Sequence, residues 1–269
     1  MLLELLLFGL VIMLASLAGV LFVGRVAQQF LMERLSFLVS FSAGVFLVTS
    51  GALALEVFEI YDVKLWQGIL LILAGYGLAW LVQYILPESH HHHDPLGHDG
   101  HSHNKTGARK LLIGDAFHNI GDGIILVPAF LVSPPLGIAV TVSIFIHETL
   151  QGISEFFVLK QAGYSTVRAL GLNFLTNSTI LIGIILSYYA LASHELEGLL
   201  LAISAGFFLH VVIHDLLPRP SAHESPSAFV QHLVVLAAGL ILMAAVSTIL
   251  SEKHEHSDGE PVVTQTSRH

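Results

Sequence analysis

Two groups of polar residues interrupt long apolar stretches of this sequence, and their side chains are of the kinds that bind divalent metal ions. One group is His-Asn-Ile-Gly-Asp at 118–122, and the other is His-Glu-Thr-Leu-Gln at 147–151. The chain has no cysteine, so any metal must use imidazole, carboxylate, amide or water ligands. Polar side chains inside apolar segments are costly and usually mark an ion path, a relay or a cofactor site.

The spacing within each group puts two ligands on one face of a helix. Positions four apart are neighbours on a helix, so His118 shares a face with Asp122, and His147 with Gln151. The turn near 133–135 is short, so the two helices should be antiparallel neighbours with both groups at similar depth. The four side chains therefore predict one divalent ion, such as zinc with its four ligands.

Asn119 and Glu148 lie one position further round each helix and could frame a second, adjacent site. We expect weaker metal binding or proton handling there. Polar residues can also simply join membrane helices, but six of them at matched spacing favour metal binding. The second group also begins like the zinc hydrolase signature His-Glu-x-x-His, in which Gln151 stands at the second histidine. An intramembrane zinc hydrolase, which would need an open coordination position, is therefore an alternative.

Further polar residues could extend an ion path on either side of these groups. They are Asp115, Glu155, Asn173, Asn177, His210, His214 and Asp215. For the two asparagines, hydrogen bonding between helices is the simpler role, and Glu155 could instead lie at the membrane interface. Asp115, His210 and His214 could form an exit station near the cytoplasm.

The segment 89–103 is rich in histidine and low in complexity. Such tracts bind metal through composition rather than a fixed geometry. We expect this cytoplasmic loop to be disordered and to buffer or sense metal ions. Its histidines are His90, His91, His92, His93, His98, His101 and His103.

The elements that must position these groups are transmembrane helices. Of the 269 residues, 54% are hydrophobic and only 12% are charged, against about 25% charged in a typical soluble protein. Eight apolar segments approach or exceed the roughly 20 residues of a membrane span. They are 2–24, 35–58, 65–86, 111–133, 136–162, 166–191, 197–217 and 228–250. The net charge of −9 argues against nucleic acid as a partner.

Basic residues predict how these spans are oriented. With both termini outside, eight of the eleven lysines and arginines fall in cytoplasmic loops and only Lys64 falls in an external loop. Cytoplasmic loops generally carry the excess of basic residues. We therefore expect a transmembrane domain at 1–250, a cytoplasmic loop at 87–110 and a disordered external tail at 251–269.

A repeated motif organises the spans. Ser-Ala-Gly-Val-Phe-Leu at 42–47 recurs as Ser-Ala-Gly-Phe-Phe-Leu at 204–209, which is 162 residues later. Adding 162 to the residue numbers of the first three spans gives nearly the residue numbers of the last three. Because the copies would run in opposite directions, the sequence predicts inverted repeats in a 3+2+3 arrangement, with both polar groups in the central pair. Chance recurrence of small residues in membrane helices is the alternative.

These motifs resemble the ZIP family of divalent metal transporters. Its fourth helix reads His-Asn-x-x-Asp/Glu-Gly, matched at 118–123, and its fifth often reads His-Glu-x-Pro-His/Glu, matched in part at 147–151. Eight helices, outside termini and the histidine-rich loop fit as well. The resemblance implies His118, Asp122, His147 and Gln151 as primary ligands, with Asn119 and Glu148 at the neighbouring site.

The resemblance also implies metal uptake, a homodimer, and an elevator-like motion of helices 1, 4, 5 and 6 against the rest. Two departures from the family pattern matter. Leu150 replaces a proline, which favours a less kinked helix. Gln151 replaces an acid or histidine, which makes a two-metal centre doubtful.

The sequence therefore predicts an integral membrane protein that is not an enzyme. It would import a divalent metal by secondary transport. Zn²⁺ is the expected substrate, and Fe²⁺, Mn²⁺ and Cd²⁺ are the other candidates. The sequence contains no phosphate-binding loop motif, which argues against direct use of ATP. A metal exporter is the third possibility, although eight spans and a short tail count against it. We expect the location to be a prokaryotic plasma (inner) membrane.

Overall fold

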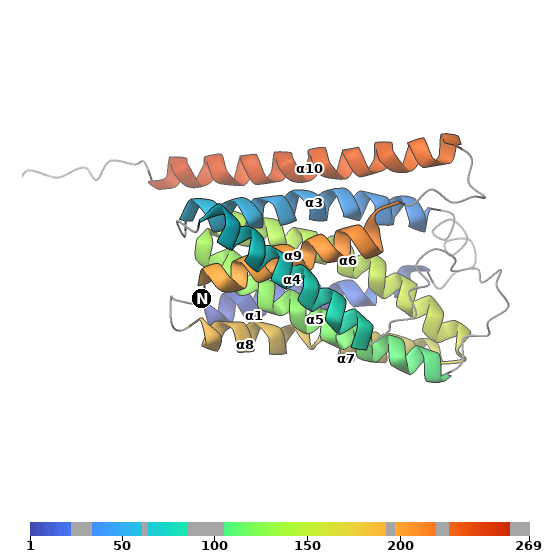
Figure 1. Cartoon of the computed structure of the whole chain (residues 1–269). Helices are drawn as coiled ribbons and strands as arrows, with labels where there is room; N and C mark the ends of the chain where they lie inside the picture. Colours follow the sequence, from blue (N-terminus) through green and yellow to red (C-terminus); the bar gives the residue numbers. More distant parts are fainter. Residues whose placement is uncertain (23–33, 61–63, 86–104, 192–196, 219–225, 259–269) are drawn as a thin grey trace, which may run out of the picture.

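The computed structural model describes residues 1–22, 34–60, 64–85, 105–191, 197–218 and 226–258, and the regular structure within these ranges is entirely helical (Figure 1). The elements in chain order are α1 (Leu2–Ala15), η1 (Ser16–Phe22), α3 (Leu35–Ile60), α4 (Leu65–Ile85), α5 (Lys105–Val132), α6 (Pro134–Gln161), α7 (Thr166–Asn177), α8 (Ile180–Ala190), α9 (Glu197–Val211), η3 (Val212–Leu216) and α10 (Pro226–Asp258).

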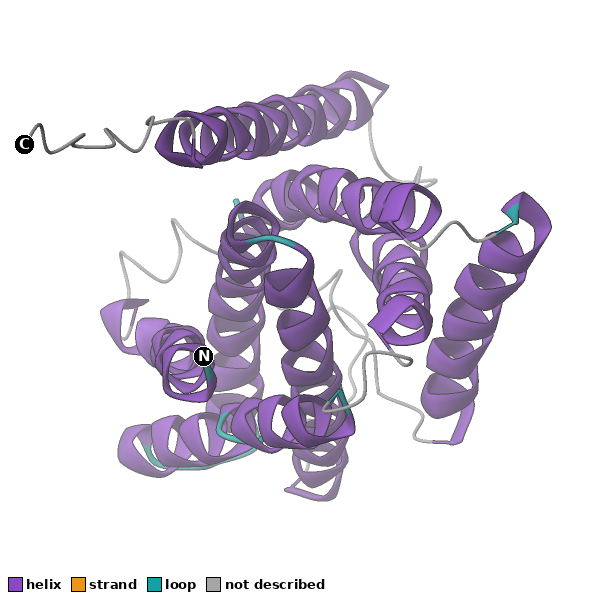
Figure 2. Cartoon of the chain, turned by 90° about the vertical axis from the view of Figure 1, so that its left-hand side faces the viewer, coloured by secondary structure: helices purple, strands orange, loops and turns teal. Residues whose placement is uncertain are grey.

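Six of the described helical segments are long and apolar enough to cross a membrane. Two further apolar helices, at Leu65–Leu81 and Gly198–His214, are shorter. A multi-span, all-α membrane protein is thus confirmed, while the full set of eight spans and the position of the termini stay predictions. Figure 2 shows the helix that leads to the C-terminus, α10, at the outside of the bundle, and Figure 1 shows it above α3.

Two helices extend beyond the ends that hydropathy predicted. α5 begins at Lys105, inside the segment assigned to the loop, and α10 continues to Asp258, inside the segment assigned to the tail. Both extensions are polar, and lysine and glutamate are good helix formers in water, where hydropathy gives no signal. The loop histidines, from His90 to His103, lie outside the described residues.

Two predicted spans are each built from two helical pieces. α1 changes to the 3-10 helix η1 at Ser16, and α7 ends at Asn177 before α8 resumes at Ile180. Ser16 donates its Oγ to the carbonyl of Met13 at 2.7 Å, a local bond that competes with the regular helix. The second break, at Ser178, lies 162 residues after Ser16.

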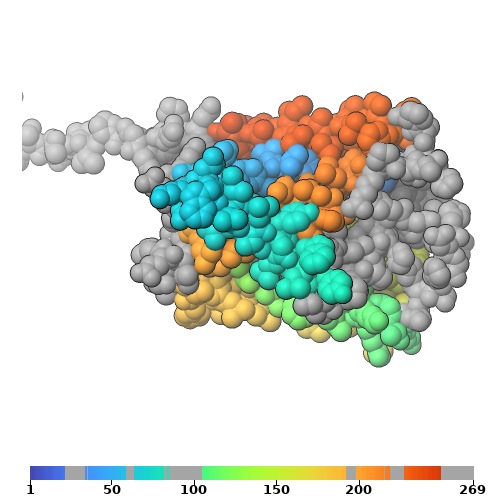
Figure 3. Space-filling view, in the orientation of Figure 1, coloured from blue at the N-terminus to red at the C-terminus, as the bar shows by residue number. Residues whose placement is uncertain are grey.

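Glycines allow two outer pairs of helices to cross backbone against backbone. On α3, a side chain at Gly44 would collide with the carbonyl of Leu236 on α10, and Gly239 of α10 meets α3 in the same way. On α9, Gly206 lies against the carbonyl of Ile72 on α4. In the same way, Gly75 of α4 lies against the carbonyl of Ile203 on α9. Small residues permit such close approach in membranes. The space-filling view shows α4 covering α9 (Figure 3).

The same reciprocal arrangement joins α5 to α8. A side chain at Gly123 would meet the carbonyl of Ile180, and one at Gly183 would meet the carbonyl of Ile120. The carbonyl of Ile120 belongs to the first polar group, so α8 lies directly behind that group. The crossing therefore fixes one wall of the candidate site.

Candidate metal centre

A tight turn between α5 and α6 brings the two polar groups together. Ser133 adopts an extended backbone and its Oγ accepts a hydrogen bond from the amide of Leu136 at 3.3 Å, which caps α6. Pro134 follows in the first turn, where a missing N–H costs no helix bond. The two helices consequently return side by side.

Three side chains converge at the centre of this hairpin. Ligand atoms of His118, His147 and Glu148 all lie within 4.8 Å of one another. The Nε2 of His118 lies 3.9 Å from Glu148 Oε1 and 3.9 Å from Asp122 Oδ2. A tetrahedral zinc ion with bonds of about 2.1 Å separates its ligands by about 3.4 Å. His118, His147 and Glu148 therefore need only a modest contraction to hold one ion, and Asp122 lies beside this group through its contact with His118.

The carboxylates at this centre are fully buried. Asp122 and Glu148 are both 0% exposed. Neither oxygen of Asp122, nor Oε1 of Glu148, accepts a hydrogen bond from the residues that the structure describes. Buried carboxylates without such partners are costly unless a cation compensates them. The arrangement is therefore suited to binding a cation.

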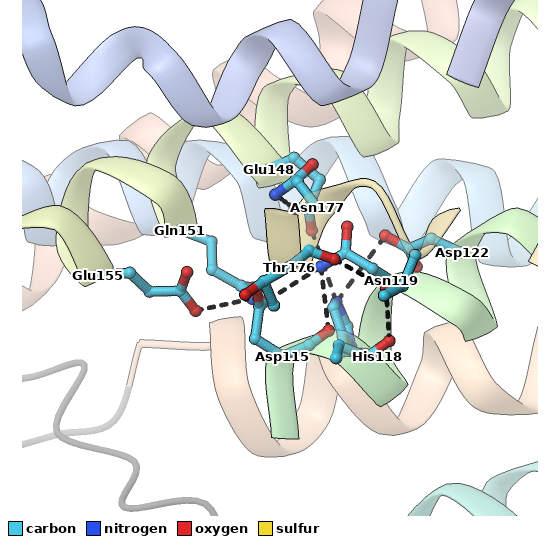
Figure 4. A network of polar contacts seen from close by, with 11 residues as sticks. Asp115, His118, Asn119, Asp122, Glu148, Gln151, Glu155, Thr176 and Asn177 are labelled. Carbon is cyan, nitrogen blue, oxygen red and sulfur yellow. Dashed lines mark hydrogen bonds and ion pairs between the residues drawn. The ribbon is translucent and has the colours of Figure 1, made fainter. Parts of the chain in front are cut away.

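Glu148 lies with the two histidines, and the amide nitrogen of Gln151 is directed to two other acids. The Nε2 of Gln151 donates to Asp115 Oδ1 and to Glu155 Oε1, the latter at 3.4 Å. Asp115 Oδ1 also accepts a hydrogen bond from Asn119 Nδ2 at 3.0 Å. The amide N–H groups thus point to the two acids (Figure 4). Gln151 and Asp115 form a polar region beside the centre.

The broken helix α7–α8 supplies two asparagines to the hairpin. Asn177 Nδ2 donates to Glu148 Oε2 at 2.8 Å, and Asn173 Nδ2 donates to the backbone carbonyl of Gly152 at 2.7 Å. Thr179, at the break, donates its Oγ1 to the carbonyl of Ala116 on α5 at 2.8 Å. The asparagines in an apolar segment indicated a contact between helices. The break between α7 and α8 was not predicted from the sequence.

Aromatic side chains that sequence reasoning did not select pack against the histidines. The ring of Phe46 lies 5.0 Å from that of His147, and Phe207 lies 6.2 Å from His118, both between centroids. Phe46 and Phe208 also contact each other at 4.8 Å. All three phenylalanines belong to the repeated motif, so the repeat is the feature of the sequence that could have indicated them.

The histidines expected at the exit form a separate cluster with Tyr76. The rings of His210 and His214 stack at 4.5 Å, and Tyr76 Oη lies 2.7 Å from His214 Nε2. His214 lies on η3, a π-helical turn closed by the hydrogen bond from the amide of Leu217 to the carbonyl of Val212. Such turns often occur at functional sites. The side chain of Asp215 lies outside the described part of the structure.

Comparison with known proteins places these residues in a family context. A family model described as ZIP Zinc transporter matches residues 82–247. The zinc transporter ZIP4 of Homo sapiens is 32% identical over 140 residues, covering 51% of this chain and 22% of the relative. Zinc transporter ZIP5 of Homo sapiens is 32% identical over 168 residues, covering 59% and 31%. Zinc transporter foi of Drosophila melanogaster is 28% identical over 159 residues, covering 55% and 22%. The chain thus spans less than a third of each relative.

Proposed function

This chain belongs to the ZIP zinc transporter family, and we propose that it is a secondary transporter carrying Zn²⁺ across a membrane toward the cytosol. Related divalent ions such as Fe²⁺, Mn²⁺ and Cd²⁺ are the other candidate substrates, since imidazole and carboxylate suit them too. The relatives described above are named zinc transporters. Zinc is therefore the first substrate to test.

One observation carries the proposal. Beside His118 and His147 lie two fully buried carboxylates, Asp122 and Glu148, three of whose oxygens accept no hydrogen bond from the described residues. A purely structural polar cluster would satisfy its acceptors. A cation near the two histidines and the two acids would supply what these oxygens lack.

The polar region beside the centre provides a next position along the path. Asp115 and Glu155 are both buried, at 1% and 3% exposed, and both face the amide of Gln151. We place this region on the cytoplasmic side of the centre and the His210–His214 pair at the mouth. Histidine must lose its proton to bind metal, so zinc entry and release can be accompanied by proton movement.

The same proposal includes eight spans in a 3+2+3 arrangement of inverted repeats, with both termini outside. Support comes from the reciprocal glycine crossings of α3 with α10 and of α4 with α9. Gly44 and Gly206 are 162 residues apart, as are the helix breaks at Ser16 and Ser178. An inverted duplication accounts for both coincidences. A homodimer and a prokaryotic inner membrane remain part of the proposal, although the relatives named above come from animals.

The alternatives have less support. Membership of a family of transporters argues against an intramembrane hydrolase. Gln151 stands where the hydrolase signature has its second histidine, and its amide nitrogen donates to Asp115. An exporter would use the same ligands, so only the direction of flux distinguishes it.

Zinc uptake into liposomes containing the purified protein tests the proposal. We expect His118→Ala with His147→Ala to abolish uptake, because two of the converging ligands are lost. His232→Ala is a matched control, since His232 is also buried but contacts Ser40 at 2.8 Å between α10 and α3. Uptake that survives the double substitution would refute the assigned centre. Zinc moving only out of right-side-out vesicles would support the exporter.

A further inference from the structure

We propose that Asn177 is a positioning residue that holds Glu148 as a one-oxygen ligand and thereby favours zinc over manganese. This inference rests on the proposed function, because it concerns the ion that the same centre selects. The evidence for it is that the two carboxylate oxygens of Glu148 have different surroundings.

The two oxygens face different ways. Oε2 of Glu148 accepts the amide hydrogen of Asn177 at 2.8 Å, while Oε1 lies 3.9 Å from Nε2 of His118 and accepts no hydrogen bond from the described residues. A carboxylate oxygen that accepts a hydrogen bond is a poorer metal ligand than its neighbour, because part of its electron density is shared with the donor. Only Oε1 is therefore presented to the centre (Figure 4).

Asn177 is held firmly enough to impose this orientation. It is 1% exposed and is the last residue of α7. Just beyond it, the Oγ1 of Thr179 donates to the carbonyl of Ala116 on α5. One turn before it, Asn173 donates to the carbonyl of Gly152 on α6. The end of α7 is thus tied to both helices that carry the metal ligands, so the amide of Asn177 cannot easily follow a rotating Glu148.

A single oxygen from Glu148 completes a small coordination shell. His118, His147 and one oxygen of Glu148 form a group of three ligands, and Asp122, which lies 3.9 Å from His118, would be the fourth. Four ligands of these types are what zinc prefers. Manganese prefers six ligands rich in oxygen. A carboxylate that can bind through both oxygens supplies one of the extra ligands, as it does for other larger cations. Removing the Asn177 donor should therefore improve manganese binding relative to zinc.

The competing explanation is that Asn177 only joins α7 to α6. Asn173 provides the matched comparison, because it is the same residue type on the same helix and donates through the same atom. Its acceptor is the backbone of Gly152 rather than a ligand carboxylate. A purely structural role predicts the same consequences for both asparagines.

The experiment measures uptake of Zn²⁺ and Mn²⁺ in competition, using liposomes that contain the full chain. Asn177→Ala and Asn177→Leu both remove the donor, and the second keeps a side chain of similar size without adding a charge or an oxygen ligand. We expect each to raise the ratio of manganese to zinc uptake about tenfold, which corresponds to about 1.4 kcal/mol. Asn173→Ala should keep the wild-type ratio even if its overall rate falls.

Equilibrium competition between the two ions on the purified protein in detergent gives a second readout that needs no transport. The same tenfold change is expected there. A ratio that stays at the wild-type value in both Asn177 variants, or that moves equally in Asn173→Ala, overturns the inference. If the wild-type chain binds zinc but moves none, the proposed function fails while the binding ratio still decides the role of Asn177.

Discussion

Phe46 and Phe208 occupy the same position in the two copies of the repeated motif, and their rings pack together with centroids 4.8 Å apart. Both side chains are fully buried, and Phe46 also contacts the ring of His147. The repeat therefore does more than set helix direction. It brings one aromatic residue from each copy to the centre of the bundle, directly beside a candidate ligand.

Phe46→Ala should destabilise the protein through a cavity next to His147. Replacing a buried phenylalanine by alanine commonly costs about 3–5 kcal/mol in soluble proteins, and we expect the lower end because lipid already provides apolar surroundings. Thermal unfolding in detergent measures the change. Phe145→Ala is the control, since Phe145 on α6 is 38% exposed. Equal losses at both positions would argue against a tightly packed centre.

Asp122→Asn should have opposite effects on the metal-free and the metal-bound protein. Without metal, the substitution removes a buried carboxyl group whose oxygens accept no hydrogen bond from the described residues, so the stability should rise by about 1–3 kcal/mol. With zinc, a ligand charge is lost, and the affinity should fall by about 100-fold or more, beyond the 10–100-fold typical of outer-shell changes. Melting with chelator and with added zinc measures both. A change of the same sign in both states would contradict Asp122 as a ligand.

Alanine at Gly44 or Gly206 should force a helix crossing apart. A new methyl group there meets the backbone of α10 or α4, and overpacking of this kind costs about 1–3 kcal/mol. Gly51→Ala, on the same helix as Gly44, faces open space and should be neutral or slightly stabilising. Unfolding in detergent compares the three variants. Similar stability of all three would mean that the crossings are looser than described.

Tyr76→Phe should slow zinc uptake several-fold without weakening zinc binding at the central site. The substitution removes the hydroxyl that lies 2.7 Å from His214 Nε2, so that imidazole loses one of the contacts that orient it. Uptake and equilibrium binding, measured on the same preparation, separate the two effects. Tyr189→Phe is the control because Tyr189 is 67% exposed. A weakened central site would show that Tyr76 acts on the fold as a whole.

The sequence pointed to the side chains that converge here, because histidines and carboxylates stand out against apolar helices. Spacing by four placed His118 with Asp122, in agreement with their 3.9 Å separation. Spacing could not decide between Gln151 and Glu148, because that depends on which acceptors lie near each side chain. Gln151 finds Asp115 across the hairpin, at a position 36 residues away in sequence.

The contribution of α7 was the least predictable part of the site. The apolar stretch at 166–191 reads as one continuous helix, since leucine and isoleucine flank the break on both sides. The interruption at Ser178 and Thr179 depends on side-chain hydrogen bonds to backbone carbonyls, including that of Ala116 on another helix. Tertiary contacts of this kind leave no periodic signal, so the placement of Asn177 beside Glu148 required the structure.

The reciprocal glycines also restrict how the molecule can change shape. Where α3 meets α10, α4 meets α9 and α5 meets α8, each backbone rests on the other, so sliding or hinging within a pair would drive carbonyl groups into Cα atoms. If the centre is exposed first to one side of the membrane and then to the other, each of these three helix pairs should therefore move as a rigid unit. Movement between these pairs is less restricted wherever side chains, rather than backbones, make the contact.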